Sequence, residues 1–109
     1  MSVALMIKEI DGQESDRYIP IAGEKIFLNY WEPVIETEGF VWLSLIQPGL
    51  WFTEEDLPAI VKELQDLQQA VPRYYQPDTT AYQQMEERLT NVLAELAELK
   101  GKRVKLYIG

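Results

Sequence analysis

The spacing of apolar residues predicts a strand at each end of the chain. The apolar start indicates a first strand over Val3–Ile10, and clean alternation over Arg103–Ile108 indicates a last strand with its even-numbered apolar residues facing inward. Residues 11–16 are turn formers and predict a polar loop. Residues 17–22 are expected to form a short extended piece, interrupted by Pro20 and Gly23.

Residues 26–46 carry large apolar groups at both odd and even positions. We predict a hairpin here, with arms near Lys25–Ile35 and Phe40–Gln47 around a turn at residues 36–39. A half-buried strand should alternate apolar with polar residues, so both faces of this hairpin need cover. Pro33 cannot donate a ladder hydrogen bond, which places the first arm at a sheet edge or at a bulge.

Two amphipathic helices are predicted after the hairpin. The first begins at Thr53 or Asp56, both of which are good caps. Its apolar stripe has helical spacing and consists of Leu57, Ile60, Val61, Leu64, Leu67 and Val71. The second begins at Asp78 or Thr80 and ends at Lys100, before Gly101. Its apolar residues are spaced alternately three and four apart: Tyr82, Met85, Leu89, Val92, Leu96 and Leu99. This seam fits an antiparallel pair with the first helix, or else an intermolecular coiled coil.

These elements predict one α+β domain spanning residues 1–109. We expect a mostly antiparallel sheet of about four strands, in the sequence order strand, strand, strand, helix, helix, strand. The antiparallel αα-hairpin should pack on one face of that sheet. Helices are then available for one face only. The other face is either covered from within by the first strand and residues 17–23, or it is an interface.

Charge narrows the classes of partner. Ten basic and eighteen acidic side chains give a net charge of −8, which repels nucleic acid and anionic lipid and favours a basic partner. Four basic residues lie in the last ten positions, where they suit a helix C-terminus or, alternatively, a nucleic-acid contact. We expect neither a membrane span nor a signal peptide at the start of the chain. The lack of cysteine fits a reducing compartment. With no signal peptide expected, a cytoplasmic location is the default expectation.

The sequence lacks the side chains on which most catalytic mechanisms depend. There is no histidine and no cysteine, which excludes the usual triads and the usual zinc, copper and haem ligands. Single glycines provide no phosphate-binding loop. Carboxylates remain: Asp11, Glu14 and Asp16 could form a cation loop or a solvated turn, and Glu32 is either buried with a raised pKa or points to water. We expect no cofactor and no metal, and treat an enzyme with paired carboxylates as the third hypothesis.

Aromatic residues gather in and after the predicted hairpin, and aromatic side chains are enriched at the centres of protein interfaces. Their arrangement depends on the register of the hairpin, which a bulge at Gly39 would shift by one residue. The candidate partner-binding residues combine these aromatics with nearby acids and are Phe27, Trp31, Phe40, Trp42, Trp51, Glu36 and Glu38.

In size, acidity and aromatic content the chain resembles the immunity proteins that neutralise bacterial toxins, whose acidic surfaces bind basic nuclease sites. The resemblance extends to no motif. It implies a non-enzymatic inhibitor that binds a basic protein, and this is the leading hypothesis. The alternative is a homodimeric structural or regulatory protein that uses its aromatic sheet face for self-association.

Overall fold

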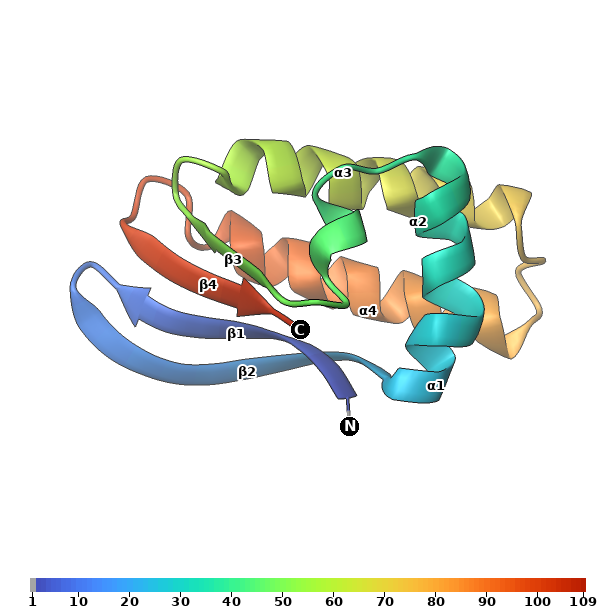
Figure 1. The fold of residues 1–109 in the computed structure, drawn as a ribbon, viewed down its shortest axis with the longest axis horizontal. Helices are drawn as coiled ribbons and strands as arrows, with labels where there is room; N and C mark the ends of the chain where they lie inside the picture. Colours follow the sequence, from blue (N-terminus) through green and yellow to red (C-terminus); the bar gives the residue numbers. More distant parts are fainter. Residues whose placement is uncertain (1) are drawn as a thin grey trace.

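The computed structural model describes residues 2–109. Its elements are, in chain order, β1 (Ser2–Ile10), β2 (Gln13–Gly23), α1 (Glu24–Ile26), the π-helical turn η1 (Phe27–Trp31), α2 (Glu32–Glu38), the 3-10 turn η2 (Leu43–Leu45), β3 (Leu50–Thr53), α3 (Leu57–Ala70), the 3-10 turn η3 (Val71–Arg73), α4 (Thr80–Ala97) and β4 (Val104–Ile108) (Figure 1). The predicted α+β class is confirmed.

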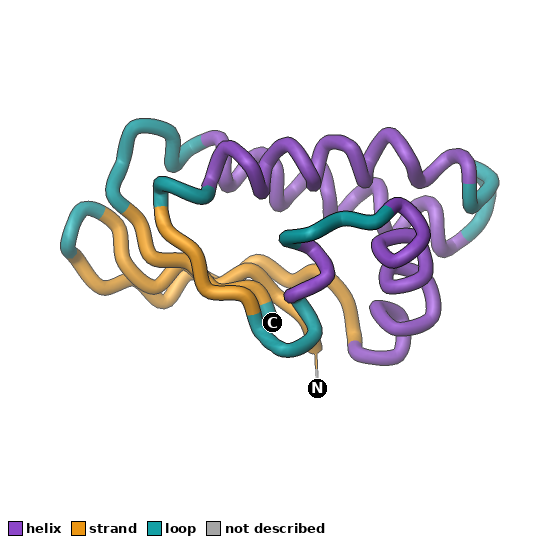
Figure 2. The backbone as a smooth tube through the Cα atoms, turned by 45° about the horizontal axis from the view of Figure 1, so that its top comes forward, coloured by secondary structure: helices purple, strands orange, loops and turns teal. Residues whose placement is uncertain are grey.

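The four strands form one antiparallel sheet in the order β2-β1-β4-β3. Helices α3 and α4 lie across one face of it, and the helix over residues 24–38 stands at the end where β2 finishes (Figures 1 and 2). No helix of the described chain covers the other face. The prediction that helices cover one side of the sheet is therefore confirmed.

The register of the sheet explains which side chains reach the core. Leu106 on β4 is paired with Ile7 on β1 and with Phe52 on β3, and all three side chains are buried. Val104 and Ile108 are also buried, as the alternation of the last strand predicts. The strands thus present one continuous apolar face to the helices.

The predicted hairpin over residues 25–47 is wrong, because its first arm is a continuous helix from Glu24 to Glu38. Phe27, Trp31, Val34 and Ile35 are all buried, and their spacing of 0, 4, 7 and 8 residues is that of one helix face. The π-helical turn ends two residues before Pro33 and allows the helix to accommodate this proline. The Glu32 N–H bonds to the Phe27 carbonyl five residues back, and the proline follows at the start of α2, where a missing N–H is tolerated.

The predicted hairpin turn is the C-terminal cap of this helix. Gly39 has φ 72° and ψ 32°, the left-handed conformation that glycine adopts without strain. Its N–H donates to the Ile35 carbonyl at 3.1 Å, and the Phe40 N–H donates to the same carbonyl at 3.3 Å. The second predicted arm, residues 40–47, contains η2 and turns instead of a strand.

A carboxylate from α3 holds the start of this irregular segment. Glu63 accepts hydrogen bonds from three successive backbone N–H groups: Val41 at 3.2 Å, Trp42 at 3.0 Å and Leu43 at 3.0 Å. An anion is a favourable partner for N–H groups that converge at the start of a helical turn. These bonds occupy donors that a strand would have used in a sheet ladder, so they compete with the predicted arm.

The antiparallel helix pair is confirmed. Met85, Leu89, Val92, Leu96 and Leu99 of the predicted seam are buried. Gln68 of α3 donates to Glu86 and Thr90 of α4, at 3.1 Å in both cases. The N-cap of α4 is Thr79, whose hydroxyl accepts from the Tyr82 N–H, rather than either predicted neighbour. None of the helices between residues 2 and 109 combines the length and hydropathy that a membrane crossing requires.

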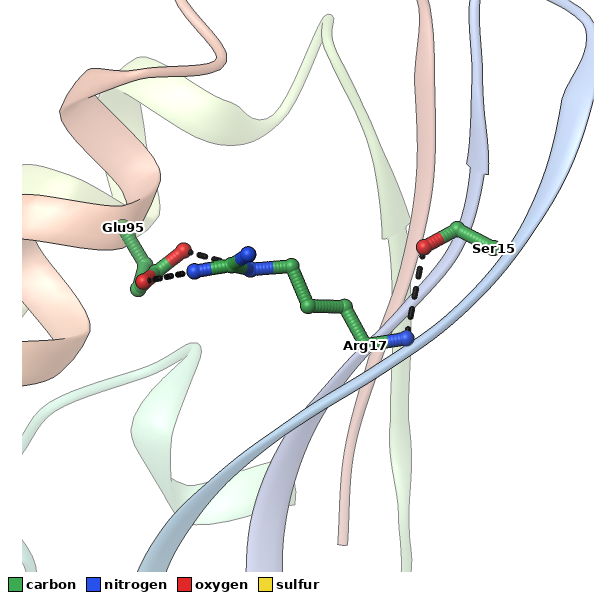
Figure 3. A network of polar contacts seen from close by, with 3 residues as sticks. All are labelled: Ser15, Arg17 and Glu95. Carbon is green, nitrogen blue, oxygen red and sulfur yellow. Dashed lines mark hydrogen bonds and ion pairs between the residues drawn. The ribbon is translucent and has the colours of Figure 1, made fainter.

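An ion pair ties the edge strand β2 to α4. Arg17 donates to both carboxylate oxygens of Glu95, with Nε 2.9 Å from Oε2, and its own N–H bonds to the Ser15 hydroxyl at 3.3 Å (Figure 3). Arg17 is the ladder partner of Ile7, which is buried, so the side chains of both residues lie on the side of the sheet that faces the helices.

Side chains of α4 also cover the open edge of β2. Gln84 donates to the Ile21 carbonyl at 2.7 Å, and Arg88 donates to the Pro20 carbonyl at 3.2 Å. Unpaired edge groups are templates for unwanted strand pairing. With these two carbonyls occupied and a proline in the strand, edge-to-edge association through this end of β2 is disfavoured.

Candidate functional site

The open face of the sheet carries a row of large side chains, one from each strand. Tyr18 on β2 pairs with Met6 on β1, Met6 pairs with Tyr107 on β4, and Tyr107 pairs with Trp51 on β3. The neighbouring residues in each strand are directed toward the helices, so alternation turns these four away from them. We call Tyr18, Met6, Tyr107 and Trp51 the aromatic row.

The two ends of the aromatic row are the most exposed. Trp51 is 58% exposed and Tyr18 is 52% exposed, whereas Met6 and Tyr107 are half-buried. The rings of Trp51 and Tyr107 touch, with centroids 4.7 Å apart and planes tilted by 46°. The Tyr18 hydroxyl lies 3.1 Å from that of Ser2. The row is therefore an apolar strip in contact with water, most of all at its two ends.

The backbone at Gly49 makes room for the centre of this row. Gly49 has φ 110°, and a Cβ atom there would lie 2.5 Å from the Tyr107 hydroxyl oxygen. Only glycine meets both requirements without strain. The turn into β3 thus leaves room for the Tyr107 ring, which in turn contacts Trp51.

A shallow hollow of about 770 Å³ adjoins the aromatic row. Its rim carries both signs of charge, with two lysines and three acids. Its lining consists of Lys8, Glu9, Glu14, Ser15, Trp51, Phe52, Thr53, Asp56 and Lys105. The hollow therefore presents side chains of both signs, within a chain whose net charge is −8.

The structure separates the candidate partner-binding residues predicted from the sequence. Phe27 and Trp31 belong to the core, with 1% and 2% exposure, and their rings stack at 6.0 Å. The Trp31 indole N–H donates to the Gln84 side chain at 2.7 Å. Phe40 and Trp42 are half-buried against the core. These four residues form no exposed aromatic centre, because the hairpin that was expected to bring them together is absent.

The predicted acids lie at the helical end of the molecule, away from the open face. Glu36 is exposed on α2. Glu38 accepts from Arg73 at 2.5 Å and from the Tyr74 hydroxyl at 2.7 Å, and this second hydrogen bond is the main reason that the pKa of Tyr74 is raised. Trp51 is therefore the single candidate residue that the structure places on the open face.

Glu32 is the unusual carboxylate of the chain. Its Oε2 atom is buried and has no hydrogen-bond partner within residues 2–109. Burial is the main cause that raises the pKa of Glu32, followed by repulsion from Glu36. The two groups lie one turn apart on the same helix. This arrangement gives Glu32 a carboxyl group that binds its proton more tightly, because of its burial and of a neighbour on the same helix.

The predicted loop around Asp11 is a tight turn between two longer strands. Asp11 has φ 51°, and its carboxylate accepts from the Arg103 N–H at 3.0 Å. Residues 2–109 contain no group of three or more acidic side chains placed to hold a metal ion. Residues 11–14 are exposed, as in a solvated turn.

Sequence reasoning missed Met6, Tyr18 and Tyr107. Alternation alone turns Tyr107 outward, since it lies between buried Leu106 and Ile108. Bringing it beside the other members needs the strand order and register, which the sequence does not state. Comparison with known proteins gives no match: no family model fits the sequence, and no curated protein or solved structure matches it. The fold and the site define an α+β protein with an open-faced antiparallel sheet.

Proposed function

We propose that this protein is a non-enzymatic protein-binding module and that the open face of its sheet is the contact surface. The observation that carries the proposal is the aromatic row, in which Trp51 and Tyr18 are more than half exposed. Trp and Tyr are the residues that most often dominate the energy of protein interfaces. Large apolar groups aligned on an uncovered sheet are typical of interaction sites.

The sequence supports a role without catalysis. It supplies no histidine or cysteine as base, nucleophile or soft metal ligand. The proposal also includes a cytoplasmic location, which the lack of cysteine supports.

An inhibitor of the immunity type, directed at a basic protein, is the second candidate. Its support is the net charge of −8, which would accelerate encounter with a basic partner. The acids lie mainly outside the open face, so they would steer the partner rather than contact it at the centre. For such a partner, the association rate should fall as salt is raised, and a rate independent of salt would contradict this candidate.

The test of the proposed function compares two exposed apolar residues on different parts of the surface. Trp51→Ser removes the most exposed member of the aromatic row. Val41→Ser is the matched control, because Val41 is 70% exposed and lies beside α3. Both variants should remain folded by circular dichroism.

Immobilised wild type, Trp51→Ser and Val41→Ser are each exposed to purified wild-type protein and to a lysate of the source cells. We expect any protein retained by wild type to be retained by Val41→Ser and lost on Trp51→Ser. Truncating a central interface aromatic costs about 2 kcal/mol or more, which is roughly a 30-fold loss of affinity. Equal retention by all three forms would contradict the open face as the contact surface.

A further inference from the structure

We propose that the open face binds a second copy of this chain, in a two-fold symmetric sheet-on-sheet dimer. This inference rests on the proposed function and names the partner for the same surface. A two-fold interface must be self-complementary, so that residue i meets residue j and residue j meets residue i. The order of side chains across the open face meets this condition.

The strand order sets the symmetry. Consider a two-fold axis that lies above the open face, parallel to the strands and midway between β1 and β4. The order β2-β1-β4-β3 of one copy then lies over β3-β4-β1-β2 of the second copy. The aromatic row then lies on itself in reverse. Tyr18 meets Trp51 of the second copy, and Met6 meets Tyr107 of the second copy. Aromatic–aromatic and sulfur–aromatic contacts are both favourable.

The same symmetry pairs opposite charges. Lys105 lies two residues before Tyr107 on β4, and its ladder partner on β1 is Glu9. Both residues line the hollow of the open face. Reversal of the strand order brings Glu9 over Lys105 of the second copy, twice per dimer. Neither residue forms an ion pair within residues 2–109 of one chain. Because both lie on the two central strands, the twist of about 30° usual between packed sheets displaces this pairing less than it displaces one on the edge strands.

Charge favours a second copy over a basic protein at this surface. The hollow carries two lysines and three acids, so it offers side chains of both signs to a partner, although the chain as a whole has a net charge of −8. A strongly basic partner would find little charge complementarity at the aromatic row. Two copies joined through this face keep their acidic helical sides apart.

The size of the face predicts a weak dimer. Four strands give a width of roughly 19 Å, and the five residues of β4 give a length of roughly 17 Å. This footprint lies below the ~800 Å² per partner of a standard interface. Association should therefore depend on concentration, and measurements need to extend from about 1 µM to about 1 mM.

The test is sedimentation velocity with charge-reversed variants. Wild type should shift from the 12.7 kDa monomer toward twice that mass as concentration rises. Glu9→Lys alone and Lys105→Glu alone should stay monomeric, since each dimer would place like charges opposite each other.

An equal mixture of the two variants should recover the dimer. In a mixed dimer, the lysine introduced in one variant faces the glutamate introduced in the other. The Lys105 that the first variant retains likewise faces the Glu9 that the second retains. Both contacts then join opposite charges, as in wild type.

Matched controls exclude an effect of net charge. Glu87→Lys and Lys62→Glu make the same charge changes on exposed positions of α4 and α3, and both should dimerise as wild type does. Trp51→Ser, altered at an exposed position, should be monomeric without reversing any charge. Circular dichroism verifies that every variant is folded.

The outcomes distinguish failure of the dimer from failure of the proposed function. A wild type that is monomeric throughout but retains a different protein through Trp51 overturns the second copy and leaves the proposed function standing. A wild-type dimer that the mixture fails to recover, or that survives Trp51→Ser, uses another surface and overturns the inference. A monomer that retains nothing through Trp51 overturns both.

Discussion

Removing the Glu63 carboxylate should destabilise the protein, because this group holds the segment that replaces the predicted second hairpin arm. Glu63 accepts from the N–H groups of Val41, Trp42 and Leu43, and the bonds to Trp42 and Leu43 are partly buried. In Glu63→Ala the three donors lose their acceptor. Water can reach the exposed Val41 N–H more easily than the other two.

The structure sets the size of the loss. A hydrogen bond to a charged group contributes about 1.5–3 kcal/mol net. Two partly buried bonds give an upper estimate of ~6 kcal/mol, and partial solvation of the freed amides lowers the expected loss to about 2–4 kcal/mol. Because a domain of this kind has about 5–15 kcal/mol of stability, Glu63→Ala should still fold.

Urea unfolding followed by far-UV circular dichroism measures this loss. The matched control is Asp66→Ala, which removes a carboxylate from the same helix. Within residues 2–109, Asp66 makes only an exposed pair with Lys62 at 3.1 Å, one turn away. Pairs of this kind contribute about 0.3–0.5 kcal/mol. If Glu63→Ala lost no more than Asp66→Ala, the carboxylate would not be what holds residues 41–43.

Three further changes test the packing around the site. Leu89→Ala, in the buried helix seam, should cost about 2–5 kcal/mol in urea unfolding, and a loss under about 1 kcal/mol would contradict that packing. Glu32→Gln should stabilise the protein at neutral pH, because burial raises the folded-state pKa of Glu32 and its ionised form then opposes folding. The advantage should vanish below the unfolded pKa, and an advantage independent of pH would refute this cause. Gly49→Ala should cost more than Gly39→Ala, since both have positive φ but only Gly49 would also clash with Tyr107; equal melting temperatures would contradict the clash.

Local patterns predicted the elements whose periodicity is unambiguous. The stripes of α3 and α4 and the alternation of β4 each have one apolar face, and each proved to be what its period indicated. The same rule failed for residues 24–38. Ile26, Leu28 and Tyr30 are exposed apolar residues, and they hide the helical stripe formed by the buried ones.

The composition of that segment also favoured a strand, because aromatic and β-branched residues have high strand propensity. Tertiary packing against the sheet and α4 overrides that preference, as the bond from Trp31 to Gln84 shows. The glycine at position 39 was uninformative, since a left-handed residue suits both a hairpin turn and a helix cap. The four-residue strand β3 was too short to be recognised beside the helix that follows it.

The open face was predictable in outline, but Trp51 was the single residue of the aromatic row that the sequence indicated. A helix pair large enough for one side of a sheet implies an uncovered side. Identifying Met6, Tyr18 and Tyr107 as neighbours of Trp51 requires pairings between positions up to about a hundred residues apart, which no local pattern contains.

Hydroxyl-radical footprinting tests the central claim most directly, because it reports the solvent contact of each side chain in the free and the associated protein. The account predicts that association protects Trp51, Tyr18 and Met6 from oxidation, while Tyr30, which is 41% exposed on the helical side, is oxidised equally in both states. Protection of Tyr30 with unchanged oxidation of Trp51 and Tyr18 would contradict the claim that the open face of the sheet is the interaction surface.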